Sequence, residues 1–281
     1  MAGTAKSRKS GRKISKRPAR DTAPEPETRG CVLFRGRSPF VTDGDDQYVA
    51  ILTFQSDNRK TGNMAQIWLI AENESPLEAR KLGLYRIVCG DCAVVKLCYV
   101  NLAYRPRTLY AAYKRGDYPD YDGREHDHVV AAAGVRFGAY GDPVLLPLGL
   151  VQRFADLSGG HYTGYTHQWR RLEYQRYRPY FMASCETLAD AQLAESMGWR
   201  WYMVTTEDSV PGAVLCPHQN TALKQVVLCN TCWACNGSKD RPVGAAQRRS
   251  IIARPTGWAH VEKRWNTHIN ARTALGGESV E

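Results

Sequence analysis

The sequence predicts an α/β protein whose parallel strands form a complete or partial (β/α) barrel. From Cys31 onward, apolar strand-like runs alternate with amphipathic helical runs, which is typical of βαβ units. Polar residues with useful chemistry recur where the strands are expected to end, namely Cys89, Asp142, His167, Glu186, Glu207 and Cys216. In a barrel those ends share one face, where active sites are built, although a doubly wound sheet would also gather them along one edge.

The first half of the folded region is expected to contain three strands and two helices. The strands are predicted at 49–54, 66–70 and 85–88, and the last of them runs into the first cysteines. The helices are predicted at 76–82 and 107–114, followed by a loop rich in Tyr, Asp and Gly at 116–124.

The second half alternates more clearly between strand and helix. Strands are predicted at 135–140, 162–166, 181–184, 201–204 and 251–253. Pro147 suits the first turn of a helix that stops at the Ser-Gly-Gly run 158–160. Thr187 can cap a helix that runs to Met197 and stops at Gly198.

The basic charge is concentrated in a tail at residues 1–30. The first twenty residues hold eight Lys/Arg and no acid, and removing them leaves 30 basic and 28 acidic residues. We expect this tail to be disordered and either to hold a nucleic-acid backbone or to serve solubility or localisation. The folded domain is expected at 31–258, with a cysteine-rich C-terminal segment at 214–240 and a helix or tail at 259–281.

The composition indicates a protein of the cytoplasm, or of the host cytoplasm if the protein is viral. The chain has no run of eighteen apolar residues for a membrane span, and no apolar stretch follows its basic N-terminus as in a secretion signal. Thiols stay reduced in that compartment, so the nine cysteines indicate metal ligands or core residues rather than disulfides. The sequence does not indicate an oligomeric state.

A first cysteine cluster consists of Cys89, Cys92 and Cys98, with Gly-Asp between the first two and Tyr99 directly after the third. Three thiolates within ten residues can converge on one metal, and three ligands leave a coordination position open for catalysis. The alternative is a structural zinc site completed by another side chain, for which the candidates are Asp91, His126 and His128.

A second cluster gives the stronger signal, because four cysteines can supply a full tetrahedral set. Its pattern is Cys-x12-Cys-x2-Cys-x2-Cys, formed by Cys216, Cys229, Cys232 and Cys235. Two successive Cys-x2-Cys steps favour a [4Fe–4S] cluster, since each step can bring a sulfur to a new iron corner. A structural zinc ribbon is the alternative, although zinc sites more often use two separate Cys-x2-Cys pairs.

The order of motifs over residues 85–255 resembles the radical-SAM-like proteins of phages and bacteria, in which a Cys-x2-Cys-Tyr element opens a partial barrel. The resemblance rests on the first cysteine cluster with Tyr99, on Gly141-Asp142, on residues 163–170 and on the Ser184-Cys185-Glu186 turn. The family typically uses Cys-x3-Cys-x2-Cys, whereas the spacing here is x2 then x5.

The resemblance implies that the first cluster ligates a [4Fe–4S] cluster with one free iron. S-adenosylmethionine (SAM) would chelate that iron and be cleaved reductively to a 5′-deoxyadenosyl radical. The residues bordering this cofactor would be Tyr99, Gly138 and Gly141. The second cysteine cluster would resemble the auxiliary clusters of such enzymes.

Three strand-end residues are the candidates for acid–base chemistry, namely Asp142, His167 and Glu186. Either carboxylate can alternatively bind ribose hydroxyls or cap the following helix. Two segments that mix aromatic and basic residues, 104–115 and 165–180, suit nucleotide or single-strand binding. The leading hypothesis is therefore a radical-SAM-like enzyme acting on a nucleotide or nucleic acid. The alternative is a non-catalytic nucleic-acid-binding protein with structural zinc, and a metal-dependent nuclease or replication protein is more remote.

Overall fold

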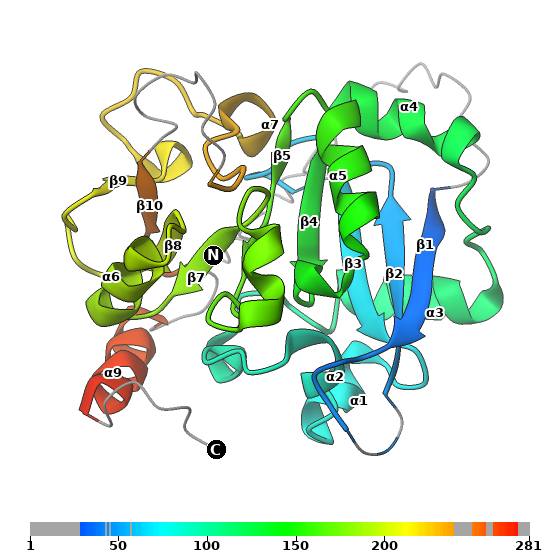
Figure 1. The fold of residues 1–281 in the computed structure, drawn as a ribbon, viewed down its shortest axis with the longest axis horizontal. Helices are drawn as coiled ribbons and strands as arrows, with labels where there is room; N and C mark the ends of the chain where they lie inside the picture. Colours follow the sequence, from blue (N-terminus) through cyan, green and yellow to red (C-terminus); the bar gives the residue numbers. More distant parts are fainter. Residues whose placement is uncertain are drawn as a thin grey trace, which may run out of the picture.

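The computed structural model describes residues 29–42, 44, 46–56, 58–238, 249–256 and 261–274. It has a mixed α/β architecture with two five-stranded sheets and surrounding helices (Figure 1), which confirms the predicted α/β class. The strand order is β1-β2-β3-β4-β5 in the first sheet and β6-β7-β8-β10-β9 in the second. The predicted tail at 1–30 lies outside the described residues except for Arg29 and Gly30.

The first sheet joins an antiparallel part to a parallel part. Its strands are β1 (Gly30–Arg37), β2 (Gln47–Thr53), β3 (Ala65–Ala71), β4 (Val135–Tyr140) and β5 (Tyr162–Thr163). The first three pair antiparallel, and β3-β4-β5 pair parallel. Every residue of β3 is buried, as expected for a central strand that is covered on both faces.

The second sheet is parallel throughout. Its strands are β6 (Tyr165–Thr166), β7 (Met182–Cys185), β8 (Trp201–Val204), β9 (Ala213–Leu215) and β10 (Ser250–Ala253). Along the chain only Gly164 separates the first sheet from the second, and a Cβ there would lie 2.5 Å from the Phe181 ring. Whether the parallel strands form a complete or partial barrel remains a prediction.

Eight α-helices and four short 3-10 turns are described. The helices are α1 (Pro76–Lys81), α2 (Arg86–Cys89), α3 (Arg105–Arg115), α4 (Gly123–Ala133), α5 (Leu148–Leu157), α6 (Leu188–Ser196), α7 (Cys229–Cys232) and α9 (Val261–Ala274). The 3-10 turns are η1 (Val95–Leu97), η2 (Pro143–Leu145), η3 (Leu172–Tyr177) and η4 (Pro217–Gln219). Thr187 caps α6 as predicted, because its hydroxyl accepts from the Asp190 N–H while the Asp190 carboxylate accepts from the Thr187 N–H.

The strand predicted at 85–88 is wrong, because this segment forms the helical turn α2. The Cys89 N–H donates to the Tyr85 carbonyl at 2.9 Å, and the Gly90 N–H donates to the Arg86 carbonyl at 3.0 Å. The apolar pair Ile87 and Val88 reads as a strand in the sequence, but tertiary packing buries both side chains from a helical turn. The first cysteines therefore follow a helical turn and not a strand end.

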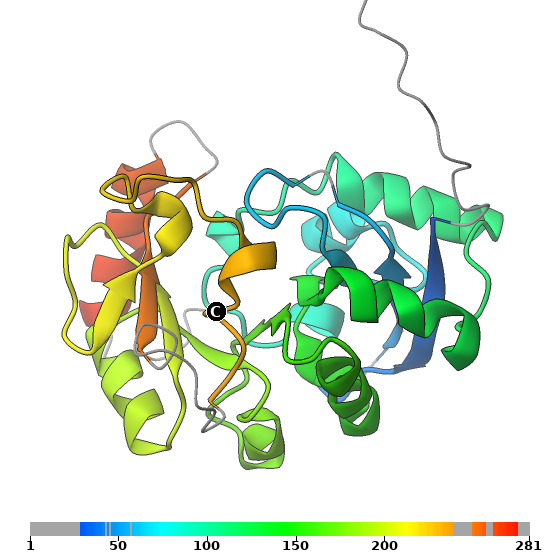
Figure 2. The ribbon, with the colours of Figure 1, turned by 90° about the horizontal axis from the view of Figure 1, so that it is seen from above.

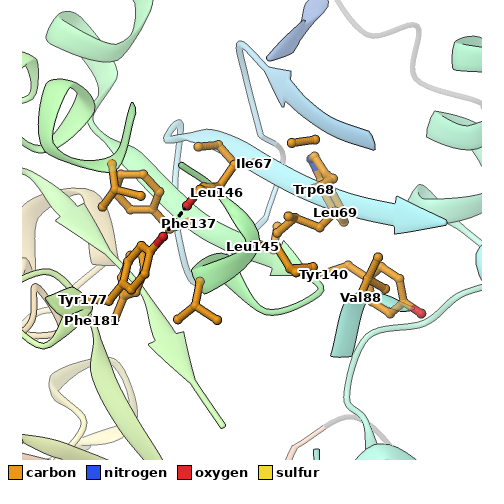
Figure 3. Close-up of a cluster of buried hydrophobic side chains, with 14 of the residues drawn as sticks. Ile67, Trp68, Leu69, Val88, Phe137, Tyr140, Leu145, Leu146, Tyr177 and Phe181 are labelled. Atoms are coloured by element: carbon orange, nitrogen blue, oxygen red, sulfur yellow. Dashed lines mark hydrogen bonds between the residues drawn. The ribbon is translucent and has the colours of Figure 1, made fainter. Parts of the chain in front are cut away.

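One apolar core connects the two sheets (Figure 3). Phe137 on β4 packs against Phe181 before β7, with ring centroids 5.4 Å apart, and Tyr177 stacks on Phe181 at 5.9 Å. The Tyr177 hydroxyl donates to the Leu146 carbonyl at 2.7 Å. This shared core fixes the strand ends of both sheets relative to each other. No helix within the described ranges combines the length and apolar character that crossing a membrane requires.

Candidate metal centre and active-site cavity

A cavity of about 340 Å³ is lined by residues from both sheets and from both cysteine clusters. Figure 2 shows α7, which carries two cysteines of the second cluster, between the two sheets. Ten of the predicted site residues line this cavity, namely Cys89, Cys92, Cys98, Tyr99, Gly138, Gly141, Asp142, His167, Glu186 and Cys229. The other three, Cys216, Cys232 and Cys235, lie behind it in a small apolar cluster against β10.

The first cysteine cluster is held against the carboxyl end of β4 by backbone contacts. The Asp142 N–H donates to the Val88 carbonyl at 2.7 Å, which ties α2 to the end of the strand. Gly90 has a left-handed φ of 53°, and a Cβ there would lie 2.6 Å from Nε2 of Gln168. Glycine at this position therefore lets the Gln168 amide approach closely and donate to the Cys89 carbonyl at 3.4 Å.

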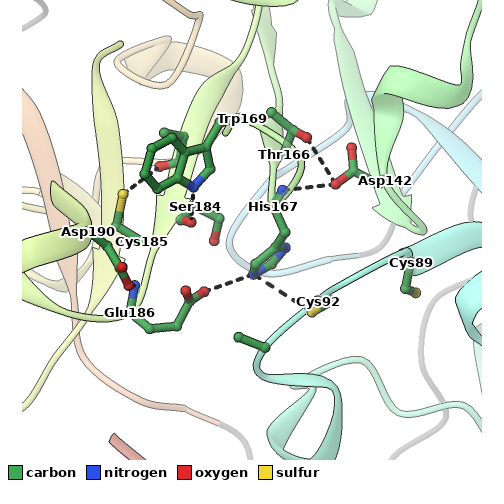
Figure 4. A network of polar contacts seen from close by, with 12 residues as sticks. Cys89, Cys92, Asp142, Thr166, His167, Trp169, Ser184, Cys185, Glu186 and Asp190 are labelled. Carbon is green, nitrogen blue, oxygen red and sulfur yellow. Dashed lines mark hydrogen bonds and ion pairs between the residues drawn. The ribbon is translucent and has the colours of Figure 1, made fainter. Parts of the chain in front are cut away.

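A polar network joins this cluster to the strand ends (Figure 4). Nε2 of His167 lies 3.7 Å from Sγ of Cys92 and 3.0 Å from Oε1 of Glu186. The Asp142 carboxylate accepts hydrogen bonds from the Thr166 hydroxyl at 3.0 Å, the His167 N–H at 2.8 Å and the Val144 N–H at 3.2 Å. Asp142 thus positions His167 and caps the turn after β4, whereas Glu186 contacts the ring itself.

Burial and neighbouring charges shift the pKa values of this network. Burial raises the pKa of Asp142, although its hydrogen bonds and His167 act in the opposite direction. Burial lowers the pKa of His167, but Cys92 and Glu186 outweigh it, so this pKa is raised well above its ordinary value. Burial, reinforced by Cys92, raises the pKa values of Cys89 and Cys98. These thiols are therefore neutral unless a metal replaces their protons.

The three residues predicted to border a cofactor all line the cavity, and each has a structural role as well. A Cβ on Gly138 would lie 2.8 Å from the Gly141 carbonyl oxygen, and one on Gly141 would lie 2.6 Å from Cβ of Leu69. Both glycines have positive φ in the irregular end of β4. The Tyr99 hydroxyl accepts a hydrogen bond from Arg136 and links the first cluster to the beginning of the strand.

The second cysteine cluster is anchored by segments from distant parts of the chain. The Cys229 N–H donates to the Lys60 carbonyl at 2.9 Å, and the Cys216 N–H donates to the Ile252 carbonyl at 2.7 Å. Arg200 donates to the carbonyls on both sides of Cys235, Ala234 at 2.8 Å and Gly237 at 2.7 Å. This network holds the cysteine loop against β8 and β10.

Trp233 fixes the turn inside the second cluster. It is the one described residue other than glycine with positive φ, at 53°, and it lies between Cys232 and Cys235. Its ring stacks on His161 with centroids 4.9 Å apart. The stacking offsets the cost of a left-handed conformation in a bulky residue.

The thiols of the second cluster influence one another's pKa values, as Cys235 shows. Burial raises the pKa of Cys235 to about 12; a hydrogen bond from Tyr165 opposes this shift, and Cys216, Cys229 and Cys232 reinforce it. Thiolates such as those of the second cluster are suitable ligands for zinc or for an iron–sulfur centre. The same is true of the three thiols and the imidazole of the first cluster. Within the described part of the chain, no three Cys, His, Asp or Glu side chains form a set that could hold a metal ion.

Several other predicted features lie away from the cavity. His126, a candidate for completing the first cluster, is buried on α4 beside Phe54, with ring centroids 5.3 Å apart, and does not line the cavity. In the segment 165–180 only Tyr165 and His167 line the cavity. The other rings of that segment belong to the core, for example Trp169, whose indole N–H donates to the Ser184 carbonyl at 2.9 Å.

Sequence reasoning missed three residues that line the cavity beside Cys229, namely Lys60, Arg136 and Tyr202. Tyr165, which lines the same end, belongs to a segment that was predicted for nucleotide binding. Arg136 interrupts the apolar strand β4, and period two places it on the same face as Gly138 and Tyr140. An arginine within an otherwise apolar strand was the sequence signal that could have identified Arg136 as a site residue. Lys60 lies in a loop, and nothing in its sequence neighbourhood marks it.

Comparisons with known proteins found no matching protein-family model, curated protein or solved structure.

Proposed function

We propose that this protein is a radical-SAM-like iron–sulfur enzyme whose active site is the cavity between the two cysteine clusters. One observation carries the proposal: Cys89, Cys92 and Cys98 line the same cavity as His167 and Glu186. Three thiolates leave one iron of a [4Fe–4S] cluster open to SAM. A cubane places its thiolates on different iron atoms, so the proposal does not require three donors around a single ion.

The cluster, when bound, would supply reductive cleavage of SAM, and the protein would supply placement and acid–base chemistry. The buried Glu186 and the half-buried His167 form a pair that can hold or pass a proton beside the first cluster. Asp142 keeps the His167 backbone in register with β4. The second cluster would hold a further centre, whose Cys229 faces the cavity.

The test is an anaerobic analysis of iron, acid-labile sulfide and zinc in the full-length protein, followed by incubation with SAM and a reductant. We expect brown protein with about four iron and four sulfide per centre, and formation of 5′-deoxyadenosine. Colourless protein with stoichiometric zinc and no iron would overturn the proposal.

A non-catalytic nucleic-acid-binding protein with structural zinc is the second candidate. A neighbouring open cavity, which shares Leu97, Cys98 and Val100 with the main one, favours this candidate. It is lined by four basic residues and no acidic one: Arg80, Lys81, Lys96 and Arg264. Such a groove suits a phosphate backbone. The metal analysis separates the two candidates.

A further inference from the structure

The end of the main cavity beside Cys229 carries two cations, Lys60 and Arg136, that pair with no carboxylate within the described residues, although both interact electrostatically with the Cys229 thiol. Arg136 is 8% exposed, and Lys60 is half-buried. Neither side chain forms an ion pair within the described residues. The Arg136 guanidinium donates to the Tyr99 hydroxyl and lies 5.9 Å from the centre of that ring. A guanidinium has five N–H donors, so most of its donor capacity is left for a ligand.

The acidic residues that line the cavity are engaged elsewhere. Asp142 accepts its three hydrogen bonds at the opposite end of β4, and Glu186 pairs with His167. Arg254 also lines the cavity, but it is paired with Asp208 at 2.7 Å. The positive charge beside Cys229 is therefore not neutralised by a cavity carboxylate.

Aromatic rings complete this end of the cavity. Tyr165 and Tyr202 both line it, and their ring centroids lie 4.5 Å apart. Tyrosine faces stack on nucleobases, and a planar guanidinium binds two phosphate oxygens at once. A volume of about 340 Å³ falls at the small end of ligand cavities, so one nucleotide fits better than a strand.

We propose that Lys60 and Arg136 form a phosphate subsite and that the cavity takes a mononucleotide, with its base against the tyrosines. A phosphate monoester carries about −1.5 to −2 charges at neutral pH on one tetrahedral group, which matches two converging cations, whereas a dicarboxylate spreads the same charge over two separate groups. This inference deepens the proposed function by naming its substrate class and rests on the same cavity, but it does not depend on which metal the cysteines hold.

The probe is uridine 5′-monophosphate, titrated by calorimetry into anaerobically purified full-length protein of known iron, sulfide and zinc content. We expect uridine and succinate each to bind at least tenfold more weakly than the monophosphate. Arg136→Gln and Lys60→Gln should each weaken monophosphate binding about tenfold or more without changing the metal content. Arg136→Lys should retain part of the affinity for the monophosphate. This variant replaces Arg136→Gln in the test if Arg136→Gln folds poorly. The charge-matched control is Lys263→Gln, on the exposed face of α9 and outside the cavity lining, which should bind as the wild type does.

Three outcomes would overturn the inference: equal binding of uridine and its monophosphate, equal binding of succinate, or unchanged affinity in both neutral variants. Loss of metal from Arg136→Gln with unchanged monophosphate affinity would assign the arginine to the second centre instead. Monophosphate-selective binding by protein without iron would support the phosphate subsite and reject the iron–sulfur enzyme, so the two failures are distinguishable.

Discussion

Sγ of Cys92 and Nε2 of His167 lie 3.7 Å apart across a sequence separation of 75 residues. The same ring nitrogen contacts Glu186 at 3.0 Å, so one imidazole atom links the first cysteine cluster to a buried carboxylate. A metal bound at Cys92 would therefore sit beside a proton-carrying pair. This arrangement is the basis for treating the first cluster as the reactive one.

The two cysteine clusters should respond differently to substitution. Cys92→Ala should abolish SAM cleavage with a modest loss of stability, because it removes a ligand from the proposed open site. Cys232→Ala should mainly destabilise the fold, by roughly 5–10 °C in Tm, because a closed metal site contributes folding free energy. Thermal unfolding and 5′-deoxyadenosine formation measure the two effects.

Cys31→Ala is the control for these variants, because Cys31 is buried in the main core and belongs to neither cluster. It should keep the wild-type iron content and activity. If wild-type protein with intact clusters neither binds nor cleaves SAM, the radical-SAM assignment fails, and a structural or redox role becomes the better account.

Asp142→Ala should destabilise the protein by about 2–4 kcal/mol, since it leaves two buried N–H groups and one hydroxyl without their acceptor. Asp142→Asn should cost less, because the amide oxygen can still accept. Urea unfolding at constant m-value measures the difference. Equal losses for the two variants would show that the carboxylate charge, and not hydrogen bonding, is what the site requires.

Alkylation should distinguish the core thiols from the cluster thiols. Cys31 and Cys185 are 0% and 2% exposed, so the reagent cannot reach them in the folded protein, and burial also raises the pKa of Cys31 to about 12. Burial also raises the pKa of Cys185. After metal removal under native conditions, iodoacetamide should modify the half-buried cysteines of the two clusters while Cys31 and Cys185 stay unmodified, as peptide mass spectrometry would reveal. The half-buried cysteines are Cys89, Cys92, Cys98, Cys229 and Cys232. Rapid modification of Cys31 would contradict the buried core position.

Deletion of residues 1–28 should weaken binding to DNA or RNA and flatten its salt dependence. The described fold begins at Arg29, so the deletion leaves β1 intact. For a duplex, every phosphate that the shortened protein no longer neutralises makes the slope of log K against log salt shallower by about 0.9. Filter binding at several salt concentrations measures this slope. An unchanged slope would assign any nucleic-acid binding to the folded domain.

The sequence predicted helices and strands best where the local pattern of apolar and capping residues matched the burial found in the folded protein. The strand at 135–140 and the strand at 201–204 have the predicted bounds, and Thr187 begins α6 as its capping pattern indicates. The predicted strand at 162–166 is divided at Gly164, where the Phe181 ring leaves no room for a side chain. That steric constraint comes from a residue distant in the sequence.

The residues lining the candidate site were partly predictable from the sequence, and its charges were not. Four of the predicted cysteines line the cavity, together with His167 and Glu186, which were predicted from strand ends. That the cysteines hold a metal stays a prediction. The segment before Cys89 was predicted as a strand because Ile87 and Val88 are apolar and β-branched, yet it is helical. Lys60 comes from a loop, and only the folded chain brings it beside Cys229.

The hydrogen bond from Cys229 to Lys60 also constrains when a metal can enter. The two residues are separated by more than half of the chain, and contacts over such separations form late in folding. During synthesis, the loop that receives Cys229 leaves the ribosome long before the cysteines of the second cluster do. We therefore expect insertion of the proposed second centre to be post-translational and to act on an already assembled scaffold, so that nascent chains stalled before residue 229 would lack it.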